Sequence, residues 1–175
     1  MRLSFQTDYA LRTLMYLAAK DGHHSISAIA GAYRISKNHL MKVAQRLVAE
    51  GFIESVRGRS GGLKLARPAS ALNVGKVVRT MEDTTTFVEC FNPVTNTCVV
   101  TPACGLRHTL AGAVEAFAQH LDQFTVADLM PDLEQYQHRL QIGALKSPGF
   151  DIGSTDSRAA APPTDPTPLF GKDNS

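Results

Sequence analysis

The chain has 175 residues, a net charge of +2, three cysteines and no tryptophan. This length suits one compact domain with an appendage, and the interrupted apolar pattern of residues 1–22 is not that of a signal peptide. No stretch approaches the roughly 18 apolar residues that a membrane-spanning helix needs. We therefore expect a cytoplasmic protein, with no membrane partner, whose thiols stay reduced.

A first helix is predicted from Thr7 or Asp8 to about Lys20. Thr7 is the expected N-cap, Asp8 stands where the helix dipole favours an acid, and Gly22 follows the end of the helix. Residues 24–26 can form a short strand. Apolar residues at helical spacing supply the buried face of this helix.

A helix-turn-helix is predicted next. Ser27 is expected to cap a brief helix over residues 28–34, and Ser36 a longer one over residues 37–50 that ends at Gly51. Two helices joined by a tight turn, with a basic second helix, are typical of this DNA-binding motif.

A β-hairpin should follow the basic helix. Residues 53–56 and 63–65 read as strands, and the intervening "RGRSGG" has the glycines that a tight turn with positive φ requires. Arg57 and Arg59 lie near its tip, and arginines on a wing suit a narrow minor groove. Asn73 is then expected to cap a helix over residues 74–83.

Charge is divided unevenly along the chain. Residues 1–80 contain thirteen Lys or Arg and four acids, whereas residues 81–175 contain five Lys or Arg and twelve acids. A basic half favours contact with nucleic acid over the alternative of an unevenly charged, merely solvated surface. The candidate DNA-contacting residues are Ser36, Lys37, Asn38, His39, Lys42, Arg46, Arg57 and Arg59.

All three cysteines fall within one loop, at Cys90, Cys98 and Cys104. An odd number cannot pair off within one chain, and the spacing differs from the short knuckle of a structural zinc site. The thiolates could bind zinc with His108 as fourth ligand, or hold an iron–sulfur cluster. The spacing of the cysteines alone does not distinguish a zinc site from an iron–sulfur cluster.

The acidic half is predicted to be helical after the cysteines. Apolar residues spaced by threes and fours form one stripe over residues 106–124, which a small winged domain cannot cover alone, so a partner subunit is expected to cover it. Thr125 and Asp128 suggest a capping box for a last helix over residues 126–141, with Pro131 in its first turns.

The predicted fold is mainly α with a small β-hairpin wing. We assign a winged helix-turn-helix DNA-binding domain to residues 1–80 and a cluster-binding cysteine loop to residues 81–105. A dimerisation helix and a C-terminal helix occupy residues 106–142, and residues 143–175 form a tail that we expect to be disordered. No acid–base pair or pocket-forming motif appears, so we expect no enzyme.

Several blocks of the sequence resemble a known family. These are "TDYALRTLMYLA", "ISKNHLMKV", "VRGRSGGLKLARPA", "TPACGL" and "FTVADLM", and they resemble the iron–sulfur winged-helix regulators that include NsrR and IscR proteins. The resemblance covers residues 1 to about 135. "NHLMK" and "TPAC" are most similar to the NsrR type, the nitric-oxide-sensing repressors of the family.

This resemblance implies a homodimer that holds a cluster in each cysteine loop and binds AT-rich inverted repeats of double-stranded DNA. It assigns the three cysteines as ligands of a cluster, with 4Fe–4S favoured over 2Fe–2S. IscR-type members add a histidine three residues after the last cysteine, where this chain has Arg107. NsrR-type members use an acid at the start of the first helix, which corresponds to Asp8 of the partner subunit. A carboxylate is a weak, replaceable ligand for such a cluster, which suits a sensor.

The function expected from this resemblance is a repressor that senses nitric oxide and releases the operators of nitrosative-stress genes. Two alternatives stay open at this point. One is an IscR-type sensor of iron or cluster supply, and the other is a zinc-binding or thiol redox module with a basic surface.

Overall fold

The computed structural model describes residues 3–58, 61–83 and 87–145. Helix α1 (Phe5–Ala19) begins after Ser4, whose hydroxyl accepts a hydrogen bond from the Thr7 backbone N–H at 3.2 Å. The prediction that Thr7 caps this helix was therefore wrong. Ser4 has the extended backbone of an N-cap residue, whereas Thr7 is fully buried within the first turn. Gly22 follows the helix with φ +88°, as a chain reversal there requires.

Helices α2 (Ile26–Tyr33) and α3 (Lys37–Ala49) form the predicted helix-turn-helix. Ser25, not Ser27, caps α2, because its hydroxyl accepts from the Ala28 N–H at 3.1 Å. Arg34 turns the chain in the left-handed region (φ 55°), and the Ile35 N–H closes the turn on the Ala30 carbonyl at 3.0 Å. Within the described residues, the Ser36 side chain makes no capping hydrogen bond, although it holds the N-cap position of α3.

Strands β1 (Ile53–Val56) and β2 (Gly62–Leu65) pair antiparallel to form the predicted hairpin. The register places Glu54 opposite Lys64, and their side chains form an ion pair at 3.0 Å. The expected strand at residues 24–26 is reduced to one bridge, in which His24 and Leu63 exchange two backbone hydrogen bonds at 2.9 Å. A Cβ at Gly62 would lie 2.8 Å from the His24 carbonyl oxygen, so this close approach favours glycine there.

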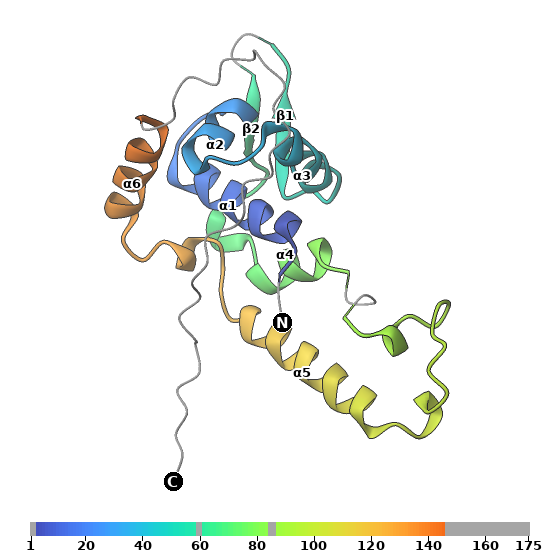
Figure 1. The fold of residues 1–175 in the computed structure, drawn as a ribbon. Coiled ribbons are helices and arrows are strands. Elements are labelled where there is room, and N and C mark those ends of the chain that lie inside the picture. Colours follow the sequence, from blue (N-terminus) through green and yellow to red (C-terminus); the bar gives the residue numbers. More distant parts are fainter. Residues whose placement is uncertain (1–2, 59–60, 84–86, 146–175) are drawn as a thin grey trace.

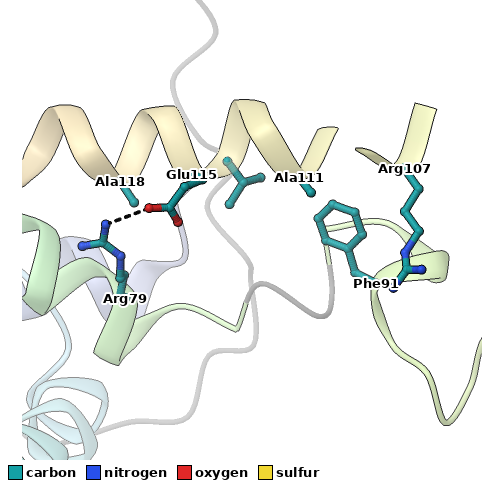
Figure 2. A pocket seen from close by; sticks show the side chains of 7 residues that line it. Arg79, Phe91, Arg107, Ala111, Glu115 and Ala118 are labelled. Carbon is teal, nitrogen blue, oxygen red and sulfur yellow. Dashed lines mark hydrogen bonds and ion pairs between the residues drawn. The ribbon is translucent and has the colours of Figure 1, made fainter. Parts of the chain in front are cut away.

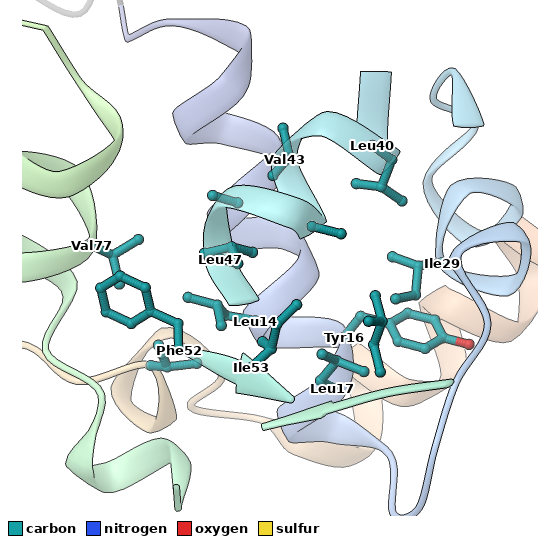
Figure 3. Close-up of a cluster of buried hydrophobic side chains, with 14 of the residues drawn as sticks. Leu14, Tyr16, Leu17, Ile29, Leu40, Val43, Leu47, Phe52, Ile53 and Val77 are labelled. Carbon is teal, nitrogen blue, oxygen red and sulfur yellow. The ribbon is translucent and has the colours of Figure 1, made fainter. Parts of the chain in front are cut away.

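The hydrophobic core lies between α1, α2, α3 and the hairpin (Figure 3). Leu14 of α1 is fully buried at its centre, and the inward stripe of α3 packs onto it. The largest fully buried apolar side chains are Leu14, Ile29, Leu40, Val43, Leu47, Ile53, Leu72, Val74, Val77 and Val126. The 3.6-residue spacing of Leu40, Val43 and Leu47 therefore directs one face of α3 inward and leaves the polar face outside.

Helix α4 (Val74–Met81) follows a single 3₁₀ turn, η1 (Ala69–Ala71), and packs against α1. Asn73 caps it as predicted, accepting from the Lys76 N–H at 2.8 Å. Helix α5 (Gly105–Leu121) runs away from the winged domain, and the cysteine loop lies at its far end (Figure 1). Two short 3₁₀ turns, η3 (Glu89–Phe91) and η4 (Thr101–Ala103), lie within that loop.

The last predicted helix is divided into two elements. A 3₁₀ turn, η5 (Ala127–Leu129), comes first, and helix α6 (Leu133–Leu145) begins only after Pro131. Asp128 accepts from both the backbone N–H and the hydroxyl of Thr125, which fixes the 3₁₀ turn and does not start a longer helix. Proline lacks the N–H that a helix interior needs, so the helix starts beyond it.

Helix α6 returns to the winged domain and packs against α2 (Figure 1). The Tyr33 and Tyr136 hydroxyls are hydrogen-bonded to each other across this contact, and burial raises the pKa of both phenols. The predicted fold class, mainly α with a small hairpin, is confirmed. In the part of the chain that the structure describes, no helix has the length and apolarity to cross a membrane. Most of the predicted tail, residues 146–175, lies outside the described residues.

Candidate nucleic-acid interface and cysteine loop

Helix α3 presents its basic and amide side chains to solvent. Lys37, Asn38 and His39 occupy its first turn, Lys42 follows one turn later, and all four are exposed. Ser36 is also exposed directly before them. Because the opposite face is buried in the core, these side chains are held at one edge of the domain by a rigid helix. They form a surface suited to phosphates and base edges.

The hairpin extends beside this helix, as in other winged domains (Figure 1). Arg57 is exposed at the end of β1, where the turn begins. Arg59 lies outside the described residues, so its role stays a prediction. A Cβ at Gly61 would lie 2.2 Å from the Val56 carbonyl oxygen, so the turn folds back tightly on β1.

Arg46 differs from the other basic residues of α3. Its guanidinium nitrogens donate to the backbone carbonyls of Thr80 and Met81, at the C-terminal end of α4, with 3.2 Å to Met81. The cation is therefore engaged within the chain. The sequence places Arg46 on the basic helix, but its spacing carries no signal for this contact.

The three cysteines are distributed along the loop between α4 and α5. Cys90 lies in η3 and Cys98 in the middle of the loop, whereas Cys104 precedes α5 as its N-cap residue. Cys98 is exposed and the other two are half-buried, and all three carry unpaired thiols. Reactive or metal-binding thiols need access of this kind, whereas a structural core cysteine would be enclosed.

Polar side chains of the loop hold its backbone. Asn92 accepts from the Val94 N–H at 3.0 Å, and the Asn96 amide group donates to the Thr101 hydroxyl at 3.0 Å. The Glu89 carboxylate accepts from the hydroxyl and the backbone N–H of Thr97 at 2.6 and 2.7 Å, and these bonds lower the pKa of Glu89. The loop thus has a defined path on either side of Cys98.

The donor set fits a soft metal centre. Thiolates are the ligands that iron–sulfur clusters require, and the loop supplies three of them. Within residues 3–58, 61–83 and 87–145, no three Cys, His, Asp or Glu side chains lie close enough to share one metal ion. This finding bears on a single ion such as zinc, because each thiolate of a cluster binds its own iron. Metal–ligand bonds would fix the path of the loop around a cluster.

Asp8 is held by a neighbour on its own helix. Arg12, one turn later, contacts both carboxylate oxygens at 2.9 Å, and the guanidinium also lies 5.9 Å from the centre of the Tyr33 ring. The carboxylate is partly exposed, with 39% of its side chain accessible. His108, the alternative fourth ligand, is exposed in the first turn of α5, and Arg107 precedes it there.

A cavity of about 450 Å³ lies between α5 and the cysteine loop. Figure 2 shows Phe91 of the loop facing Ala111 of α5, with Arg107 beyond it and Arg79 of α4 at the other end. Arg79 is not available to a ligand, because it contacts both Asp122 carboxylate oxygens at 2.6 and 2.7 Å and also pairs with Glu115 at 3.5 Å. The hydrogen bonds from Arg79 lower the pKa of Asp122. The cavity is therefore a mainly apolar gap beside α5.

Helix α5 leaves its apolar stripe only partly covered, since Leu110, Val114 and Phe117 are half-buried. Among its described side chains only Ala118 is buried, and Leu106 is 62% exposed. Sequence reasoning therefore identified the stripe, but it missed the contacts that join α5 to α4. A bidentate contact between residues 43 positions apart, such as that of Arg79 with Asp122, has no local signal in the sequence.

Comparison with known proteins gives a consistent result. The family described as "Rrf2: Iron-dependent Transcriptional regulator" matches residues 3–132. The chain is 45% identical over 144 residues to the HTH-type transcriptional regulator NsrR of Bacillus subtilis, which covers 81% of this chain and 99% of that protein. It is equally identical over 144 residues to the NsrR of Shouchella clausii, with 81% and 97% covered.

Solved structures agree at the level of the fold and the family. T. potens IscR has a TM-score of 0.59 and 26% identity, over 78% of this chain and 91% of that chain. The oxidised form of Staphylococcus aureus CymR has a TM-score of 0.57 and 26% identity, over 75% and 97% of the two chains.

Proposed function

This chain belongs to the Rrf2 family of transcriptional regulators, and we propose that it is a homodimeric repressor of the NsrR type that responds to nitric oxide through an iron–sulfur cluster. Its NsrR-type relatives are named as transcriptional regulators, so it is a regulator of transcription and not an enzyme. The observation that carries the finer proposal is the presence, in one chain, of an exposed basic helix and a loop of three accessible thiols.

DNA binding is assigned to α3, which we call the recognition helix, and to the wing. Lys37, Asn38, His39 and Lys42 would enter the major groove, with Ser36 at the helix start contacting a phosphate. Arg57 and Arg59 would contact the backbone or the minor groove beside it. Two copies related by a two-fold axis would read an inverted repeat, for which an AT-rich operator fits a narrow minor groove.

The dimer is proposed to form along α5. Its apolar residues are exposed or only half-buried in the single chain, and burying such a stripe is the usual driving force for helix pairing. In that arrangement the cysteine loop at the far end of α5 would lie near the start of α1 of the second copy. This would bring Asp8 of the partner subunit to the thiols.

Cys90, Cys98 and Cys104 would hold the cluster, with Asp8 of the partner subunit as the fourth ligand. When bound, the cluster supplies iron that reacts with nitric oxide. The chain's own part is to bind it through three strong thiolates and one weak carboxylate. Arg12 already forms an ion pair with the Asp8 carboxylate at 2.9 Å. Binding of this carboxylate to iron must therefore share or replace that ion pair. This competition makes the fourth position displaceable. We assign the protein to the cytoplasm, where thiols stay reduced.

The test is anaerobic purification followed by titration with nitric oxide, while absorbance and operator binding are followed together. Loss of the cluster absorbance should coincide with release of DNA. Iron and sulfide analysis separates a cluster from zinc, and a colourless, zinc-containing protein that binds DNA equally with or without nitric oxide would refute the proposal. Response to iron supply alone would instead favour the IscR-type alternative.

A matched pair of variants tests the fourth ligand. If Asp8 only pairs with Arg12, Asp8→Ala should cost about 0.3–0.5 kcal/mol of stability, as for exposed helix pairs, and leave the metal site unchanged. If it is a ligand, the optical spectrum should shift, the cluster should decay faster in oxygen, and operator affinity should fall. His108→Ala is the control and should behave as wild type. The reverse pattern would move the ligand to His108.

A further inference from the structure

Arg46 is exposed, but its guanidinium lies against the end of α4. Its two terminal nitrogens donate to the Thr80 and Met81 carbonyls. Both carbonyls belong to the last turn of α4, where no following residue of the helix can supply an N–H. A guanidinium satisfies both at once, and its charge is favourable at the negative end of a helix dipole.

This contact joins two helices that both pack mainly against a third. Both α3 and α4 pack against α1, which lies between them in the core. The Arg46 bond crosses 34 to 35 positions of the sequence and ties the exposed helix directly to α4. A planar fork that makes two hydrogen bonds fixes orientation more strongly than a single flexible contact does.

The end of α4 is also where the proposed sensor begins. Glu82, its C-cap residue, accepts from the Ser4 N–H at 2.7 Å, and Ser4 is the N-cap of the helix that carries Asp8. The cysteine loop leaves from the same point, with Cys90 nine residues after Met81. The last turn of α4 therefore contacts the recognition helix, the start of α1 and the origin of the loop.

The opposite end of α4 is anchored to α5. The Val74 N–H donates to the Phe124 carbonyl at 2.9 Å, and the Asn73 amide group donates to the Asp122 carbonyl at 2.7 Å. Arg79, in the last turn of α4, adds two contacts to the Asp122 carboxylate. Helix α4 is thus fixed to the end of the proposed dimer helix at both its first and its last turn, and the last turn also contacts the recognition helix.

We propose that Arg46 is a positioning residue, which transmits the state of the cysteine loop through the end of α4 to the recognition helix, and that it does not contact DNA phosphates. This rests on the proposed function, and it names the part of the chain through which that regulation acts. A change in the path of the loop pulls on Met81 and Glu82. Arg46 converts that movement into a shift of the helix that carries Lys42.

The first experiment compares Arg46→Ala and Arg46→Lys with Lys42→Ala, which serves as the phosphate-contact control. Operator affinity is measured over a range of salt concentrations, before and after nitric oxide. We expect Arg46→Ala to keep the salt slope of wild type and to reduce the affinity ratio between the two states at least about fivefold, the low end of ordinary allosteric coupling. Arg46→Lys keeps the positive charge but not the planar guanidinium, so the affinity ratio between the two states should fall, but by less than in Arg46→Ala.

Lys42→Ala should instead flatten the slope by about one unit and keep the ratio. If Arg46→Ala behaves like Lys42→Ala, or if Arg46→Lys is fully wild type in slope and ratio, the proposal is overturned. A wild-type protein with no operator binding or no response to nitric oxide refutes the proposed function instead, and that outcome is visible before any variant is made.

A second measurement does not depend on DNA or on the cluster. It is the hydrogen exchange of the reduced, cluster-free full chain. In Arg46→Ala, the backbone amides in the last turn of α4 and the adjoining segment should exchange at least about fivefold faster than in wild type, because the hydrogen bonds that hold that turn are lost. Lys42→Ala should exchange as wild type there. Equal exchange in all three proteins would refute the coupling even if Arg46→Ala bound DNA poorly.

Discussion

Replacing Gly75 with alanine tests the joint between α4 and α5. Gly75 is buried in the first turn of α4, and a Cβ there would lie 2.1 Å from Oδ1 and 2.8 Å from the backbone nitrogen of Asp122. The Asp122 side chain can rotate away only by giving up both its contacts with Arg79. Even if it did, the backbone contact would remain below the 3.0 Å that real Cβ atoms respect.

The size of the effect follows from two opposing terms. Alanine is favoured over glycine in a helix by up to about 1 kcal/mol. Overpacking against a backbone atom costs typically about 1–3 kcal/mol. The overlap at Gly75 is severe, so we expect the second term to win, with a net destabilisation of about 1–2 kcal/mol. The contact between α4 and α5 should loosen, while the hydrophobic core should stay packed.

Gly31 supplies the matched control. It also lies in a helix with negative φ, and an added Cβ would meet no described atom within 4 Å. Gly31→Ala should therefore stabilise the chain by about 0.5–1 kcal/mol. Urea unfolding of the reduced, cluster-free protein, at one protein concentration and followed by circular dichroism, gives both values. Equal or improved stability in Gly75→Ala would refute the reasoning, because the close approach of α4 and α5 would then be absent.

Three further predictions concern the core, the DNA surface and the cysteine loop. Leu47→Ala, at a fully buried position of α3, should cost about 2–5 kcal/mol in the same urea experiment, and a loss below 1 kcal/mol would contradict the observed packing. Lys42→Ala should weaken operator binding and lower the log–log salt slope by about one, and an unchanged slope would remove Lys42 from the interface. The hydrogen bonds from Thr97 lower the pKa of Glu89 in the folded chain below its ordinary value of 4.5. The stability that the Glu89 carboxylate gives the loop is therefore fully present above pH 4.5 and is lost as the pH falls through the lower pKa of the folded chain. The Thr97 amide signal, followed by NMR from about pH 6 to pH 3, should report this loss, whereas in Glu89→Gln it should stay constant; a constant signal in wild type would refute the contact.

The sequence by itself determined the winged domain. The spacing of Leu40, Val43 and Leu47 fixes one inward face of α3, so its polar residues had to lie outside. The glycines of the hairpin and the Asn73 cap act within a few residues of where they stand, and both were read correctly. Local signals of this kind depend on backbone preferences, which a short window of sequence contains.

Signals of the same type failed where two candidates competed. Thr7 and Ser27 were expected as caps, but Ser4 and Ser25 hold these positions, three and two residues earlier. Serine and threonine can both cap a helix, and the choice depends on which residue keeps an extended backbone once the helix is packed. In the same way, the prediction of one helix over residues 126–141 rested on a capping box at Thr125 and Asp128. The chain instead makes a 3₁₀ turn over Ala127–Leu129 and starts α6 only after Pro131.

Only the tertiary structure decided how the pieces are joined. The contacts of Arg46 with the end of α4, of Arg79 with Asp122 and of Tyr33 with Tyr136 join residues 34 to 103 positions apart. Hydrogen bonds and ion pairs at such separations depend on where the core places each helix, and no periodicity records them. The sequence therefore marks Arg46 as one basic residue among several on α3. In the structure, Arg46 differs from Lys42 because its guanidinium contacts two backbone carbonyls. Both α3 and α4 pack on α1, and this packing brings the end of α4 next to Arg46.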